Sequence, residues 1–113
     1  MTTTAGPIRR TCQQIFRHEW RPMYLVTTYV GTPGWQPDLD AVHRTLFASA
    51  AGSDGLEHAY LEARGDTVAI SLYLLAGGSP DAVRRAVQLS RRAMAALPGG
   101  RRWSVRGTSA ELR

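Results

Sequence analysis

The side chains best suited to proton transfer gather around one predicted hairpin, at His58, Tyr60 and Tyr73. Histidine titrates near neutral pH, and a neighbouring phenol can exchange a proton with it. His58 and Tyr73 are therefore the candidates for general acid–base chemistry on a small ligand. Tyrosine is also common in protein interfaces, because it is large, fairly rigid and ends in a polar group. A non-catalytic binding surface is the stronger interpretation of the same residues.

Arginine is the second residue type that suggests chemistry, because all fourteen basic residues are arginine and the net charge is +5. A helix face rich in arginine can contact phosphates. The candidates for such a nucleic-acid contact are Arg84, Arg85, Arg91, Arg92 and Arg102. However, the lack of lysine and the abundance of Ala and Gly fit a GC-rich coding sequence, such as that of an actinobacterium. Arginine is then the default surface cation, and nucleic-acid binding is an alternative that we do not favour.

Metal and nucleophile motifs are absent from the sequence. The three histidines have no ligand-like spacing, and the single Cys12 cannot build a zinc site or an internal disulfide. No P-loop, GxGxxG fingerprint or Gly-x-Ser-x-Gly elbow occurs. We therefore expect no metal and no cofactor. His43 is expected at the boundary of the core, and the tryptophans are expected to be packing anchors.

Length and composition indicate one globular domain. The chain has 113 residues, of which 43% are hydrophobic and 20% charged, and this is ordinary for a folded protein. No apolar run approaches the ~20 residues of a membrane span. No apolar segment follows Arg9-Arg10 to form an export signal, so we expect a cytoplasmic protein.

Glycine, proline and the apolar spacing divide the chain into strands and helices. The predicted elements are a short helix at 8–20, a strand at 23–30, a helix from Asp38 to residue 51, strands at 56–64 and 67–76, a helix from Ser79 to residue 97, and a strand at 101–106. Asp38 and Ser79 are the predicted N-caps. The predicted apolar stripe of the last helix is Val83, Val87, Ser90, Met94 and Leu97. Residues 1–22 are thus an extension, 23–107 the domain and 108–113 a polar tail.

The turn at Gly65-Asp66 fixes the register of the predicted hairpin. It pairs the polar residues Arg64, Glu62, Tyr60 and His58 with Thr67, Ala69, Ser71 and Tyr73. The opposite face then pairs Ala63, Leu61 and Ala59 with Val68, Ile70 and Leu72. One face is therefore apolar and the other is mixed, as expected for an antiparallel sheet that is covered on one side.

The predicted order βαββαβ resembles the ferredoxin-like α+β fold, with a four-stranded antiparallel sheet and two helices on one face. The other face would have no helix over it, and it would include His58, Tyr60, Glu62, Arg64, Ser71 and Tyr73. The first strand can direct either of its two alternating sets of side chains to this face. One of the two arrangements adds Thr27 and Tyr29 to it. Residues 8–20 could also cover this face.

Small domains of this order often pair through such a face. We therefore expect a binding or regulatory module that forms a homodimer, with another protein or a small molecule as further partner. A cofactor-independent enzyme of the dimeric α+β-barrel type, such as a monooxygenase or cyclase, is the alternative, by analogy of fold.

Overall fold

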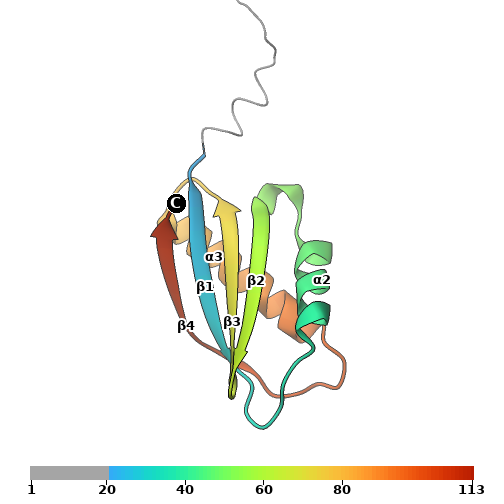
Figure 1. The fold of residues 1–113 in the computed structure, drawn as a ribbon. Coiled ribbons are helices and arrows are strands. Elements are labelled where there is room, and N and C mark those ends of the chain that lie inside the picture. The colour runs from blue at the N-terminus through green and yellow to red at the C-terminus, as the bar shows by residue number, and fades with distance from the viewer. Residues whose placement is uncertain (1–20) are drawn as a thin grey trace, which may run out of the picture.

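The computed structural model describes residues 21–113 and confirms the order βαββαβ (Figure 1). Its elements are β1 (Met23–Gly31), α2 (Leu39–Ser49), the short 3-10 helix η1 (Gly52–Asp54), β2 (Leu56–Arg64), β3 (Thr67–Leu75), α3 (Ser79–Ala95) and β4 (Ser104–Leu112). The strands form one antiparallel sheet in the order β2-β3-β1-β4. This is the ferredoxin-like α+β arrangement. The helix expected at residues 8–20 lies outside the described residues, as do Cys12 and His18.

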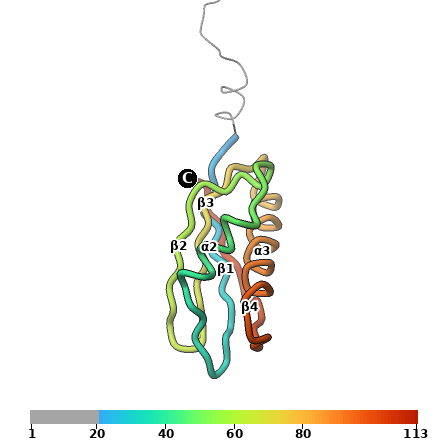
Figure 2. Tube along the Cα trace, turned by 90° about the vertical axis from the view of Figure 1, so that its right-hand side faces the viewer, coloured from blue at the N-terminus to red at the C-terminus, as the bar shows by residue number. Residues whose placement is uncertain are grey.

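Both helices pack into one core on the same side of the sheet, and Figure 2 shows α3 beside the sheet with α2 in front. The core fills the space between the helices and the sheet, with Val68, Ile70, Leu72 and Leu74 of β3 at its centre. All four side chains are buried. The opposite side of the sheet has no described helix over it, and we call it the open face (Figure 1).

The hairpin has the predicted register. Arg64 pairs with Thr67, Tyr60 with Ser71 and His58 with Tyr73. Gly65 adopts a φ of +57°, which suits the first position of a two-residue hairpin loop. The register shifts between Leu56 and His58, so the pairing is continuous from His58 to the turn.

Burial in β1 settles which of its residues lie on the open face. Val26, Thr28 and Val30 are fully buried beneath the helices. Successive side chains of a strand point to opposite faces, so Thr27 and Tyr29 lie on the open face. Thr27 pairs with Ser71, which the hairpin register already places there.

Helix α2 begins as predicted. The Asp38 carboxylate accepts hydrogen bonds from the backbone N–H groups of Asp40 and Ala41, which are otherwise unpaired at a helix start. Val42 and Leu46 are buried against the sheet.

Helix α3 is rotated relative to the predicted stripe. The predicted Ser90 and Met94 are buried, but the predicted Val83 and Val87 are only half-buried. The other buried residues are Ala82, Ala86, Leu89 and Ala93. The physical reason is close packing, because the small alanine side chains let the helix approach the sheet. Its N-cap is Gly78, one residue before the predicted Ser79.

The last strand differs most from the prediction. The sequence pattern predicts it at 101–106, but β4 runs from Ser104 to Leu112, so most of the expected polar tail belongs to the sheet. Its polar sequence hides the strand because β4 is an edge strand whose residues 108–112 are all exposed. Trp103, expected within the strand, precedes it and packs against the core, as a packing anchor should.

None of the helices among residues 21–113 is long and apolar enough to cross a membrane.

Candidate functional site

The open face brings together the predicted site residues of three strands. One row across the sheet consists of Tyr60, Ser71, Thr27 and Ser109, and the next consists of His58, Tyr73, Leu25 and Glu111. The Thr27 and Ser71 hydroxyl oxygens are 3.0 Å apart and share a hydrogen bond. The sheet therefore fixes the backbone of every residue on the face.

Tyr73 lies at the centre of an aromatic cluster. Its ring centroid is 6.2 Å from that of His58 and 6.1 Å from that of Tyr60, and both contacts are edge-to-face. Such contacts are favourable because the positive edge of one ring meets the negative face of another. Nevertheless Tyr60 is 65% exposed, and Tyr29, elsewhere on the open face, is 39% exposed. The cluster is thus ordered but open to a partner.

Ion pairs lie at two corners of the open face. Glu62 and Arg64 are 2.9 Å apart at the end of β2, and Glu111 and Arg113 are 2.9 Å apart at the end of β4. β2 and β4 are the two edge strands, and they end at opposite ends of the sheet (Figure 1). These two ion pairs therefore occupy diagonal corners of the face. The side chain of Arg106 adds a further positive charge over Gly31.

The pKa values of both arginines are raised by these surroundings. For Arg64 the main cause is the hydrogen bond to Glu62, followed by the charge of Glu62. For Arg113 it is a hydrogen bond with the Tyr73 hydroxyl, followed by the charge of Glu111. The Arg113 guanidinium therefore lies near the Tyr73 hydroxyl as well as the Glu111 carboxylate.

Leu25, Ser109, Glu111 and Arg113 are residues of the open face that the sequence did not identify. Three of them were missed because the strand pattern places the last strand too early. The signal that would have found them is the alternation of Thr108, Ala110 and Leu112 with Ser109 and Glu111. That alternation is weak because neither face of β4 is strongly apolar.

Several of the candidate arginines for nucleic-acid binding already have partners within the protein. Arg84 and Arg85 form ion pairs with Asp81 on their own helix. Desolvation raises the pKa of Asp81, but the hydrogen bonds and charges of the two arginines outweigh it, and the pKa is lowered overall. Arg91 and Arg102 are exposed, Arg102 in the connection that precedes β4.

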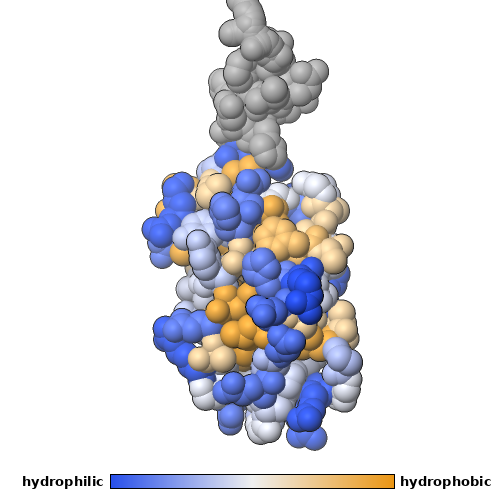
Figure 3. All heavy atoms as spheres, turned by 45° about the vertical axis from the view of Figure 1, so that its right-hand side comes forward, coloured by the Kyte–Doolittle hydropathy of each residue, from blue (hydrophilic) through white to orange (hydrophobic). Residues whose placement is uncertain are grey.

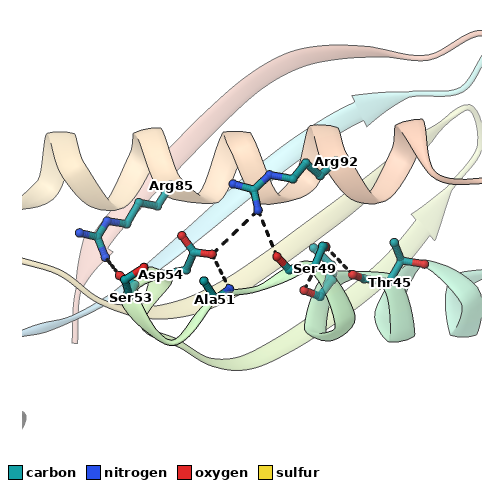
Figure 4. A network of polar contacts seen from close by, with 8 residues as sticks. Thr45, Ser49, Ala51, Ser53, Asp54, Arg85 and Arg92 are labelled. Carbon is teal, nitrogen blue, oxygen red and sulfur yellow. Dashed lines mark hydrogen bonds and ion pairs between the residues drawn. The ribbon is translucent and has the colours of Figure 1, made fainter.

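Arg85 and Arg92 connect α3 to the end of α2 and to the segment that follows it (Figure 4). Arg85 donates a hydrogen bond to the carbonyl of Ser53. Arg92 donates one of 3.1 Å to the carbonyl of Ser49 and lies 3.9 Å from the Asp54 carboxylate. These arginines therefore have a structural role in the described fold.

Apolar surface is also exposed beside the open face. Figure 3, turned so that the β2 and α2 side comes forward, shows hydrophobic surface in the middle of the view with hydrophilic residues around it. Phe47 of α2 is 40% exposed, and its ring centroid is 5.1 Å from that of His43. His43 itself is exposed, further from the core than predicted.

Within residues 21–113, no group of three or more His, Cys, Asp or Glu side chains is placed to hold a metal ion. A pocket of about 440 Å³ lies at the start of α2, lined by Trp35 and Arg101 among others and made of residues outside the open face. The arrangement on the open face itself consists of aromatic rings, hydroxyls and paired charges. Such side chains are suited to contact another surface.

No known family model, curated protein or solved structure matches this chain.

Proposed function

We propose that this protein is a non-catalytic binding module that forms a homodimer through its open face. The observation that supports the proposal is an ordered but exposed aromatic cluster on a sheet face that no described helix covers. Tyrosines with this exposure are typical of the centre of interfaces, where they contribute much of the binding energy. The cytoplasmic location expected from the sequence is part of this proposal.

The size of the open face is sufficient for a dimer. Each of its four strands has nine residues. With a rise of ~3.3 Å per residue and a strand spacing of ~4.8 Å, the face measures roughly 30 by 19 Å. Two such faces bury about 1,100 Å² as flat surfaces, and side-chain relief adds to this area. Specific interfaces begin at about 1,000 Å².

The charge pattern of the open face is self-complementary. In a face-to-face dimer the two-fold axis lies in the plane between the two sheets. A residue on one side of that axis then lies opposite the residue of the other copy whose position is reflected across the axis. A two-fold axis perpendicular to the line between the two ion pairs brings the Glu62–Arg64 pair of one copy onto the Glu111–Arg113 pair of the other. Opposite charges can then pair at the rim, around a centre of aromatic rings and hydroxyls.

Nucleic-acid binding is a weaker proposal, because Arg84, Arg85 and Arg92 already have partners in the protein. An acid–base role for His58 and Tyr73 within the dimer is the alternative. Their rings are in edge contact, and a homodimer would place both copies of the pair between the two sheets. This alternative would be favoured if the dimer converts a small-molecule substrate and His58→Ala loses that activity while remaining a dimer.

The experiment that tests the dimer compares Tyr60→Arg with Phe47→Arg. Both residues are exposed aromatics, but Tyr60 lies on the open face and Phe47 lies on α2. Light scattering after gel filtration should show a dimer for the parent chain and for Phe47→Arg. Tyr60→Arg should be a monomer with an unchanged circular dichroism spectrum, because two added cations would face each other in the interface. Equal masses for the two variants would contradict the proposal.

A further inference from the structure

The pocket at the start of α2 lies between two connections that are distant in sequence. Trp35, Pro37 and Asp38 come from the connection between β1 and α2, and Leu97 and Arg101 come from the connection between α3 and β4. Its volume of about 440 Å³ falls in the range of sites for small molecules. None of its residues belongs to the open face.

Trp35 is a fixed wall of this pocket. Its indole N–H donates a hydrogen bond of 2.6 Å to the carbonyl of Arg102, and its backbone N–H donates one of 3.2 Å to the carbonyl of Thr32. The side chain also packs against the hydrophobic core. An indole that is held at both its backbone and its ring loses little entropy when a planar ligand stacks on it.

Arg101 adds a positive charge beside the indole. Its guanidinium carbon lies 5.8 Å from the centre of the Trp35 ring, within the range of a cation–π contact. Among residues 21–113, no carboxylate forms an ion pair with Arg101. A guanidinium over an aromatic ring keeps the N–H groups at its edge, which can bind a carboxylate in two parallel hydrogen bonds.

The acidic residue of the pocket restricts the charge of a ligand. Asp38 lines the pocket, but its carboxylate accepts from two backbone N–H groups at the positive end of α2. Those hydrogen bonds offset part of the negative charge of Asp38. The charge that remains would still repel a phosphate dianion. A single negative charge near Arg101 is the better match.

We propose that this pocket binds a small planar aromatic carboxylate, with its ring against Trp35 and its carboxylate on Arg101. Pro37 and Leu97 then provide apolar walls for the ring, and water is excluded from the stacked face. This binding does not depend on the homodimer, because the open face and the pocket share no residue.

The test uses three nitroaromatic probes of similar size: 4-nitrobenzoate, neutral 4-nitrobenzamide and cationic 4-nitrobenzylamine. Each is titrated into the ¹⁵N-labelled full-length protein, and the indole N–H signal of Trp35, identified by its loss in Trp35→Phe, is followed by NMR. We expect saturable shifts of that signal with the carboxylate, affinity about three- to tenfold lower for the amide, and no saturation with the amine.

Arg101→Gln and Arg102→Gln are the matched variants. Arg102 contacts Trp35 through its backbone carbonyl, so its side chain can be changed without removing that hydrogen bond. Arg101→Gln should lower the affinity for 4-nitrobenzoate about three- to tenfold and leave that for the amide unchanged, whereas Arg102→Gln should change neither. Equal binding of all three probes, no shift of the Trp35 signal, or equal effects of the two variants would overturn the proposal.

Discussion

Thr28 is a buried hydroxyl whose replacement should stabilise the protein. It lies in β1 between Val26 and Val30, is fully buried, and its Oγ1 has no hydrogen-bond partner among the described residues. A buried hydroxyl without a partner costs about 1–3 kcal/mol. Valine has the same branched shape, suits a strand, and replaces the hydroxyl with a methyl group.

We therefore expect Thr28→Val to raise the free energy of unfolding by about 1–2 kcal/mol. For a folded part of this size, 1 kcal/mol corresponds to roughly 4–8 °C in Tm. Urea titration followed by circular dichroism, at one fixed protein concentration, measures the free energy, and a thermal scan measures Tm. The fixed concentration matters because a dimer makes stability depend on concentration.

Thr27→Val is the matched control, since Thr27 is the neighbouring residue and its hydroxyl is hydrogen-bonded to Ser71. The same chemical change should there cost about 0.5–1.5 kcal/mol, because a partner is lost. The two substitutions are thus expected to have opposite signs. A loss of stability in Thr28→Val of the same size as in Thr27→Val would refute the reasoning.

Two further predictions concern the segment between α2 and β2. Arg92→Ala should lower the free energy of unfolding by about 0.5–1.5 kcal/mol, because α2 has no basic residue in its last turn and Arg92 bonds the Ser49 carbonyl there. Arg91→Ala, at an exposed neighbouring position, should change the free energy of unfolding by less than about 0.5 kcal/mol. Equal losses for the two variants in urea titrations would contradict the role of Arg92 at the end of α2. Gly55→Ala should cost more than about 2 kcal/mol, because Gly55 has a φ of +71° and a Cβ would lie 2.4 Å from the carbonyl oxygen of Leu75. A Tm within about 2 °C of the parent chain for Gly55→Ala would contradict it.

Local sequence patterns are sufficient to predict the hairpin and its two faces. The Gly65-Asp66 turn sets the register of β2 and β3, and the alternation of Val68, Ile70 and Leu72 identifies the buried side. These features depend on residues close together in the chain. The pairing of His58 with Tyr73 is therefore predictable from the sequence of the hairpin alone.

The other half of the open face depends on pairing between distant strands. β4 pairs with β1, some eighty residues earlier, and the register shifts between Tyr29 and Val30. No local pattern specifies that bulge. The position of Glu111 beside Leu25 on the open face follows from this pairing, so the sequence could not indicate it.

The partners of the arginines also depend on tertiary structure. Helical spacing places Arg85 and Arg92 on the flank of α3, but which loop lies opposite them is decided by how α2 and α3 pack. Net charge says nothing of such pairing. The composition therefore does not show which of the arginines have partners within the protein.

The most direct test of the proposed dimer is the mass of the parent chain in solution. Sedimentation equilibrium at several micromolar concentrations reports this mass without any substitution. The proposal predicts twice the chain mass of 12.4 kDa, with dissociation toward the monomer on dilution. A mass of one chain at every concentration would contradict the proposal that the open face binds a second copy.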